Sequence, residues 1–344
     1  MSNGSKYRSR LSAIANQLIG FSVSYQRDNL LARGMGLEHL RELLIRLARP
    51  LLRQGASLAY GGHWKETEDN FTFDLLRLIS AEQEDNSLGG PDTNLAIGRL
   101  YNHSPWPDYL QITPRIEAQW INSCRIVRIT QKLAGLDDAD IVPDAEAMRQ
   151  LDRVLFNAAV TLSAMRRLAM QGMIIDTPDL QTPEVVPPIV ARVMLGGKVQ
   201  GFSGFLPGLF EEALVTLESQ RPLYVLGGFG GAAEVLAHAM LGASPARPRE
   251  FTLDWLIAGS PALKRLNELS GHFALPPIVL GSAKALDHLF QLIEQARSNL
   301  AATLNTGLDD TETRELLTTR DMSRAVQLVR KGLDAQIGLI TLVE

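Results

Sequence analysis

Residues 191–240 read ARVMLGGKVQGFSGFLPGLFEEALVTLESQRPLYVLGGFGGAAEVLAHAM. Two apolar runs in this segment, 191–195 and 222–226, have the length of a strand, and each is followed by paired glycines and then by a helical pattern. A strand, a glycine turn and a helix, repeated, are typical of a parallel sheet with helices on its faces. The segment therefore predicts an α/β fold built on a doubly wound parallel sheet.

The glycine turns are also a candidate ligand site. Glycine lets a backbone approach a ligand closely, and the free N–H groups of the following helix favour an anion. We therefore expect a phosphate-bearing, nucleotide-type ligand at the carboxyl ends of the strands. The residues expected to hold its phosphates through backbone amides are Gly196, Gly197, Gly208, Glu211, Gly227, Gly228, Gly230 and Gly231, and Pro207 is a further expected ligand contact. The alternative is that these glycines only make tight turns.

Composition limits the classes of protein to consider. The chain has 344 residues, 45% of them hydrophobic and 21% charged, which is ordinary for a globular protein. A net charge of -4 with scattered Lys and Arg argues against nucleic-acid binding. The single cysteine, Cys124, excludes an internal disulfide and a cysteine zinc cage, and its apolar surroundings predict a buried thiol.

Neither a membrane nor a metal is expected as a partner. No apolar run approaches the roughly 20 residues that a membrane span needs, and the N-terminus lacks a convincing cleavage site, so we expect a cytoplasmic protein. The acidic segment 135–144 carries no His or Glu partner at metal spacing and is interpreted as a solvated loop.

Further elements are expected along the chain. Strands are predicted at 18–24, 56–60, 100–107, 124–130 and 277–280, and helices at 36–53, 71–82, 116–121, 145–171 and 319–332. Pro50 should kink or end its helix, unless it begins a new turn, and 180–188 should form a proline-rich loop that acts as a lid or an interface. We expect one sheet domain over residues 15–245 and a mainly helical region, 246–344, that packs on it or completes it.

Other candidate ligand contacts lie at the ends of the predicted strands. Ser22 and Ser24 end the first, and Gly61 and Gly62 follow the second, although the two serines equally suit a half-exposed strand. His63, next in the chain, is interpreted as a surface histidine. Arg166 and Arg167 end the helix at 145–171, where they either complement the helix dipole or reach a phosphate.

The familiar catalytic motifs are incomplete or missing. Gly228, Gly230 and Ala233 match a loose dinucleotide-binding pattern, but no acidic residue follows at the usual distance. The sequence contains no Walker, HExxH or GxSxG motif. Glu211 and Glu212, in the first turn of a predicted helix, either complement its dipole or stabilise cationic charge at an anomeric carbon, which would be N-glycosidic cleavage.

The order of these pieces resembles the SLOG superfamily, which joins the "lonely guy" phosphoribohydrolases to nucleotide-sensing domains. Those enzymes carry a glycine turn after the second strand, an RK pair on a helix, a PGGxGTxxE motif and a KPV-type strand. Here the corresponding pieces are Tyr60-Gly61-Gly62, Arg166-Arg167, then Leu195-Gly196-Gly197 with Pro207–Glu212, and Arg221–Leu226. The resemblance covers about residues 18–240 and implies that Arg166 and Glu212 are the catalytic pair.

The sequence also departs from the family pattern. Leu195 replaces the proline before the glycine pair, Pro207-Gly208-Leu209 replaces the Gly-Thr, and about ten residues separate the two halves of the motif. The chain therefore looks more like the divergent branches associated with bacterial conflict systems, in which activity cannot be assumed.

Three functions follow as hypotheses. The first is a sensor that binds NAD, ADP-ribose or a similar nucleotide, with no cofactor firmly implied. The second is an enzyme that cleaves an N-glycosidic bond with Arg166 and Glu212, and the third is an assembly scaffold. The resemblance implies a homodimer, with an effector protein as a further partner.

Overall fold

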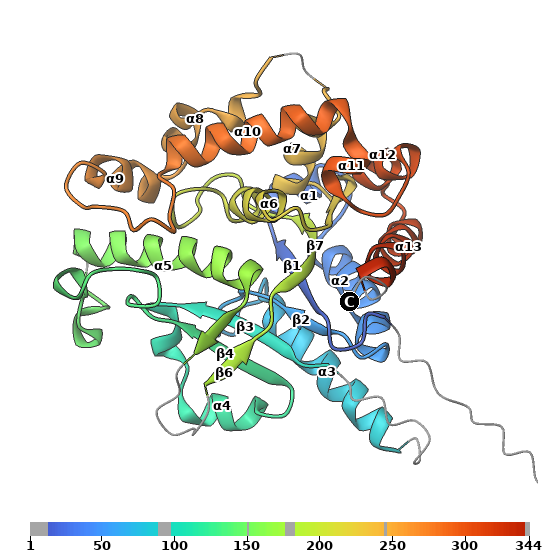
Figure 1. Cartoon of the computed structure of the whole chain (residues 1–344), viewed down its shortest axis with the longest axis horizontal. Helices are drawn as coiled ribbons and strands as arrows, with labels where there is room; N and C mark the ends of the chain where they lie inside the picture. Colours follow the sequence, from blue (N-terminus) through green and yellow to red (C-terminus); the bar gives the residue numbers. More distant parts are fainter. Residues whose placement is uncertain (1–12, 89–97, 150, 176–182, 244–245, 341–344) are drawn as a thin grey trace, which may run out of the picture.

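The computed structural model describes residues 13–88, 98–149, 151–175, 183–243 and 246–340. Within them, a six-stranded sheet has the order β4-β3-β2-β1-β7-β8, and every neighbouring pair is parallel (Figure 1). Its strands are β1 (Leu18–Ser24), β2 (Ser57–Ala59), β3 (Leu100–Pro105), β4 (Cys124–Ile129), β7 (Ile189–Gly196) and β8 (Leu223–Leu226). The predicted α/β fold with a parallel sheet is confirmed.

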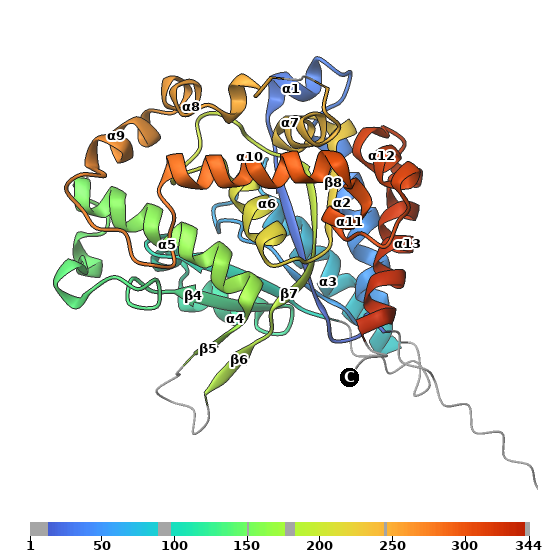
Figure 2. The ribbon, with the colours of Figure 1, turned by 45° about the horizontal axis from the view of Figure 1, so that its top comes forward.

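Helices cover both faces of this sheet (Figure 2). α2 (Leu37–Arg53), α3 (Phe71–Leu88) and α13 (Met322–Ile340) pack on one face, and α5 (Asp152–Gln171) and α6 (Gly208–Glu218) pack on the other. Ile19, Phe21 and Val23 of β1 face the first layer, whereas Leu18 faces the second. This alternation, with both faces buried, is what a central parallel strand requires.

Helices later in the chain extend the hydrophobic core of the sheet. α10 (Ser282–Ser298) lies along α6 and α7 (Gly231–Met240) and shares a hydrophobic cluster with them. The remaining helices are α1 (Arg27–Leu31), α4 (Pro114–Trp120), α8 (Leu253–Gly259), α9 (Pro261–Leu269), α11 (Leu300–Leu304) and α12 (Asp310–Thr318).

The order of strands reverses between β1 and β7. The chain runs from β1 through β2 and β3 to β4 on one side, and from β7 to β8 on the other. The connections on the two sides cross opposite faces, so a crevice opens beyond the carboxyl ends of β1 and β7. This is where an α/β sheet most often binds a ligand.

Several predicted helix boundaries were wrong. α3 ends at Leu88 rather than at 82, and α13 spans Met322–Ile340 rather than 319–332. α2 ends at Arg53 as predicted, and Pro50 lies in its last turn, where a proline disturbs little of the helix. α5 begins at Asp152 rather than at 145, since Leu151 is extended. Asp144 accepts a 2.9 Å hydrogen bond from the Trp106 indole, and Ala147 packs against that indole, which holds this segment in short turns instead.

Two other predictions were also wrong. The segment 180–188 was expected to be a loop, but it contains β6 (Glu184–Val186), which pairs antiparallel with β5 (Met173–Ile175); residues 180–182 lie outside the described residues. The strand expected at 277–280 is a turn, closed by a 2.9 Å hydrogen bond from the Val279 amide to the Pro276 carbonyl. Pro276 and Pro277 have no N–H to donate to a sheet.

Candidate functional site

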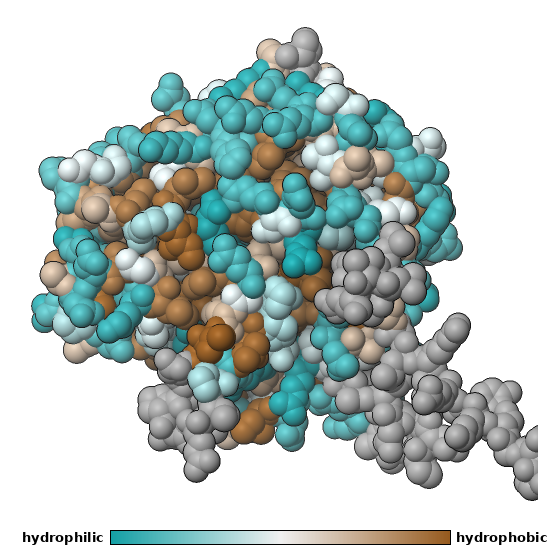
Figure 3. All heavy atoms as spheres, in the orientation of Figure 1, coloured by the Kyte–Doolittle hydropathy of each residue, from teal (hydrophilic) through white to brown (hydrophobic). Residues whose placement is uncertain are grey.

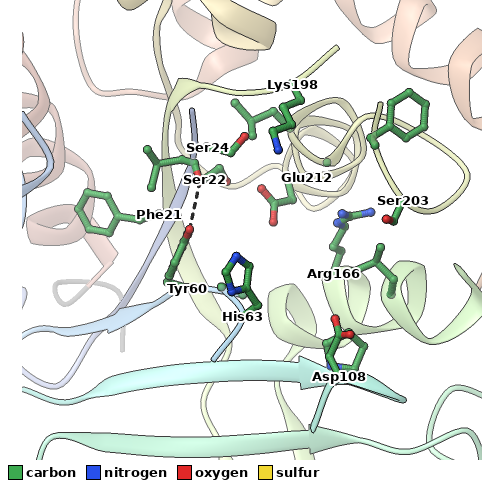
Figure 4. A pocket seen from close by; sticks show the side chains of 18 of the residues that line it. Phe21, Ser22, Ser24, Tyr60, His63, Asp108, Arg166, Lys198, Ser203 and Glu212 are labelled. Carbon is green, nitrogen blue, oxygen red and sulfur yellow. Dashed lines mark hydrogen bonds between the residues drawn. The ribbon is translucent and has the colours of Figure 1, made fainter. Parts of the chain in front are cut away.

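A cavity of about 320 Å³ opens at the carboxyl ends of β1, β2 and β3 (Figure 4). Its walls come from the sheet, from the loop after β2, from α5, and from the segment that joins β7 to α6. The lining residues with polar side chains are Ser22, Ser24, Tyr60, His63, Ser104, Asp108, Arg166, Lys198, Ser203 and Glu212. The cavity therefore lies on the β1 side of the crevice that the strand order creates.

Arg166 forms a buried ion pair in the cavity wall. Its Nη1 donates to Oε2 of Glu211, whose other carboxylate oxygen accepts a hydrogen bond from the Ser163 hydroxyl. Ser163 and Arg166 lie three residues apart on α5 and so share one face of that helix. Arg166 and Glu211 are 7% and 5% exposed, so the pair is held away from water.

The guanidinium of Arg166 also lies against the start of α6. A Cβ added at Gly208 would lie 3.2 Å from Nη2 of Arg166, so the absence of a side chain there permits this approach. α6 begins after Pro207, and no side chain caps its N-terminus. Gly208 and Leu209 of this first turn line the cavity, so the positive end of the helix dipole lies at the cavity wall beside a cation.

Glu212 points into the cavity instead of joining the Arg166 pair (Figure 4). Its carboxylate lies 3.7 Å from Nη1 of Arg192, on β7. Arg192 is 3% exposed, and it donates to the Ser22 hydroxyl at 3.1 Å and to the Thr216 hydroxyl at 3.1 Å. Burial lowers the pKa of Arg192 from its usual value, whereas the Glu212 charge opposes that shift.

The loop after β2 is fixed over the cavity by polar contacts. Asn102 donates to the carbonyls of Tyr60 and Gly62 at 3.1 and 2.8 Å, and the Tyr60 hydroxyl donates to the Val23 carbonyl at 3.2 Å. The Lys65 amide donates to Nδ1 of His63 at 3.2 Å. The neutral His63 ring thus carries its proton on Nε2, which is the nitrogen left for a ligand.

The structure brings together only part of the predicted ligand set. Ser22, Ser24, Gly61, Gly62, Arg166, Gly208 and Glu212 line the cavity. Glu211 lies in the wall through its bond to Arg166, and Pro207 precedes the first turn of α6. Arg167 points elsewhere and pairs with Glu218 at 2.6 Å.

The other predicted glycines are used in close packing. A Cβ at Gly231 would lie 2.5 Å from the Gly196 backbone, and a Cβ at Gly197 would lie 2.6 Å from Leu209. Likewise, a Cβ at Gly228 would lie 2.0 Å from the Thr319 carbonyl. The Gly231 amide donates to the Asn29 side chain at 2.9 Å, so α1 caps the start of α7. Gly196, Gly197, Gly227, Gly228, Gly230 and Gly231 do not line the cavity.

Several cavity residues were missed by the sequence analysis. Lys198 and Ser203 lie in the segment between β7 and α6, and Asp108 begins a short 3-10 helix, Asp108–Gln111; neither stretch of sequence carries a recognisable pattern. Arg192 had a usable signal, because an arginine within an apolar strand run needs buried partners. His63, interpreted from the sequence as a surface histidine, lies on the cavity wall.

Other features of the chain are simpler. Cys124 is buried, as expected, and burial raises the pKa of its thiol to about 12, so it stays protonated at neutral pH. Among the described residues, no cluster of His, Cys, Asp and Glu is placed to hold a metal ion. Within the same residues, no helix is both long and apolar enough to cross a bilayer.

Comparison with known families gives a match over most of the chain. The family described as SLOG cluster2 matches residues 13–316, a range that includes the sheet, α5, α6 and the helices through most of α12. No curated protein matches the chain. Because the match covers well over half of the sequence, the chain belongs to the SLOG superfamily, within SLOG cluster2.

Proposed function

We propose that the cavity binds a nucleotide-derived ligand and that the protein acts as a sensor of it. The observation that carries this proposal is the start of α6, which reaches the cavity without a side-chain cap and has Arg166 beside it. Such a helix end favours a phosphate, because its N–H groups and its dipole both stabilise negative charge. Membership of the SLOG superfamily supports a nucleotide-related role.

The remaining walls suit the rest of such a ligand. Ser22, Ser24 and Glu212 offer hydroxyl and carboxylate groups that can bind sugar hydroxyls. A cavity of about 320 Å³ lies at the lower end of the range for small-molecule sites. It would enclose about one nucleotide, so a larger ligand such as ADP-ribose or NAD would extend past the exposed rim at His63 and Asp108.

Lys198 provides the sharpest test of the phosphate site. It lines the cavity, its side chain is exposed, and it forms no ion pair within the described residues. Replacing it by alanine should therefore leave folding intact and weaken the binding of AMP and ADP-ribose by about five- to tenfold, the effect of losing one charge contact. Isothermal titration at two salt concentrations measures this change.

The matched control is Lys264→Ala, on the exposed side of α9 and outside the cavity lining. It should bind both nucleotides as the wild type does. Equal affinity in the Lys198 and Lys264 variants would contradict the proposed phosphate position. Native mass spectrometry of the purified protein, followed by denaturation, would show whether a nucleotide is retained and which one.

A second function, cleavage of an N-glycosidic bond, is favoured by one observation. The Glu212 carboxylate lies in the cavity and stays beside Arg192, where it can stabilise positive charge at an anomeric carbon. The Glu212→Gln variant should then release free base from AMP or NAD at least a hundredfold more slowly, while binding changes only a few-fold. Chromatography of the reaction products measures the release.

The outcomes separate the three hypotheses. Binding without release of base in the wild type supports the sensor, whereas release that is lost in Glu212→Gln supports the enzyme. A sensor in a bacterial defence system would also act through a partner or a second copy of itself, so ligand addition should change its elution in size-exclusion chromatography with light scattering. If the wild type neither binds a nucleotide nor releases base, the assembly scaffold is the hypothesis that remains.

A further inference from the structure

A second, much smaller cavity lies behind the ligand cavity, between the sheet and α5. Its volume is about 20 Å³, and it shares Tyr60, Gly61, Arg166 and Glu212 with the larger one. His103, on β3, and Arg192, on β7, line only this inner cavity. A volume of this size accommodates about one water molecule.

His103 brings a buried hydrogen-bond acceptor, its Nε2 atom, to the inner cavity. It is 2% exposed, and within the described residues its Nε2 has no hydrogen-bond partner. The ring bonds to the Tyr101 carbonyl, which leaves Nδ1 as the donor and Nε2 as an acceptor in the neutral form. Burial, with the Arg192 charge adding to it, lowers the pKa of His103 to about 4, so the ring is neutral at physiological pH. Buried acceptors of this kind almost always bind a donor.

The neighbouring groups complete a set of contacts that a water molecule can satisfy. Water donates two hydrogen bonds, which His103 Nε2 and a Glu212 carboxylate oxygen can accept. It also accepts a hydrogen bond, which the Arg192 guanidinium can donate. The 3.7 Å between Nη1 of Arg192 and Oε1 of Glu212 is longer than a direct hydrogen bond and leaves room for an oxygen bonded to both.

We propose that the inner cavity holds one water molecule, bound by His103, Arg192 and Glu212, which fixes the Glu212 carboxylate that the ligand contacts. His103 is thereby a positioning residue for the ligand site, acting through the water. The water itself is assigned from geometry alone, whereas its effect on binding rests on the proposed function.

The test combines a crystal structure with a pair of variants. A structure of the full chain at a resolution that shows ordered water should contain a single water within hydrogen-bond distance of all three side chains, both with and without AMP. His103→Leu removes the acceptor at nearly constant size and should weaken AMP binding about tenfold by isothermal titration. His103→Gln restores an acceptor near the position of Nε2 and should stay within about twofold of the wild type.

The results that overturn the inference are distinct from those that overturn the proposed function. An inner cavity that is dry, or that is occupied by an atom of the ligand, overturns the water site. A His103→Leu variant that folds and binds AMP as the wild type does overturns the positioning role. If the wild type binds no nucleotide, the proposed function fails, yet the crystal structure still decides whether the water is present. Thermal unfolding of each variant separates a loss of binding from a loss of folding.

Discussion

Glu211 and Glu212 are adjacent in the sequence but have different surroundings. Glu211 is buried against Arg166 and Ser163, whereas Glu212 reaches the ligand cavity beside Arg192. Successive residues on a helix point about 100° apart, so only one of them can face the cavity. The SLOG resemblance matched Arg166 and Glu212 as a pair, yet the structure pairs Arg166 with Glu211 and leaves Glu212 to Arg192.

His103 should make the stability of the protein depend on pH. Its pKa is about 4 in the folded chain and about 6.5 when unfolded, so the unfolded state takes up a proton first as the pH falls. Stability is therefore fully present above pH 6.5 and falls between pH 6.5 and pH 4. The loss at pH 4.5 should be about 2 to 3 kcal/mol. The charged and titratable groups around the inner cavity are Tyr60, Arg166, Arg192 and Glu212.

Urea denaturation at pH 7 and pH 4.5 measures this contribution. The His103→Gln variant cannot take up a proton and serves as the comparison, because all other groups titrate in both proteins. The wild type should lose about 2 to 3 kcal/mol more than the variant between the two pH values. An equal loss would mean that His103 is protonated, or exposed, in the folded chain.

The residues of the site were predictable only in part, and the reason is geometric. Ser22 and Ser24 lie at the end of β1, and Gly61 and Gly62 come just after β2. The carboxyl ends of parallel strands meet at one edge of the sheet. The position of Lys198 depends instead on the path of the segment between β7 and α6, which no periodic pattern defines. Tertiary contacts alone determine the position of such a residue, so the sequence does not predict it.

At the scale of elements, close packing determines which residues fit the turn between β8 and α7. A side chain at Gly228 would meet the Thr319 carbonyl at 2.0 Å, a backbone atom that cannot rotate away. Gly228→Ala should therefore lower the free energy of unfolding by about 2 kcal/mol or more, because the segment after α12 must move. Denaturant unfolding measures this change.

Gly271→Ala is the matched control for that experiment. A Cβ at Gly271 would have no heavy atom within 4 Å, so the substitution should change stability by no more than about 0.5 kcal/mol. If Gly228→Ala is equally mild, the contact between the glycine turn and Thr319 is not as close as described.

The helices and strands were largely predictable from the sequence. β1 has the bounds expected, Leu18–Ser24, because an apolar run ending in polar residues has a clear limit. β5 and β6 were missed, since each has only three residues and carries too short a pattern. The strand expected at 277–280 shows the converse, an apolar run whose prolines prevent pairing.

At the scale of the molecule, the helices after residue 245 share the core of the sheet domain. Leu286, Leu289 and Ile293 of α10 lie in one hydrophobic cluster with α6, and Leu328 and Leu333 of α13 lie in the cluster that covers β1 and β7. A fragment of residues 1–243 would expose both surfaces. It should therefore unfold without a cooperative transition, whereas a fragment of residues 1–340 should unfold as the full chain does. Calorimetry of the two fragments measures the difference, and a cooperative transition in the shorter one would contradict this prediction.

The pairing of β1 with β7 also has a consequence for the chain as it is made. Ser22 and Arg192, which bond across these strands, are 170 residues apart. At about 5–20 residues per second, a ribosome needs on the order of ten seconds or more to supply the second strand after the first. During that time the edge of β1 that later pairs with β7 has no partner strand, and an unpaired apolar strand is prone to aggregate. Newly made chains of this protein should thus depend on chaperones until β7 emerges, and slow codons between the two strands should lower the soluble yield.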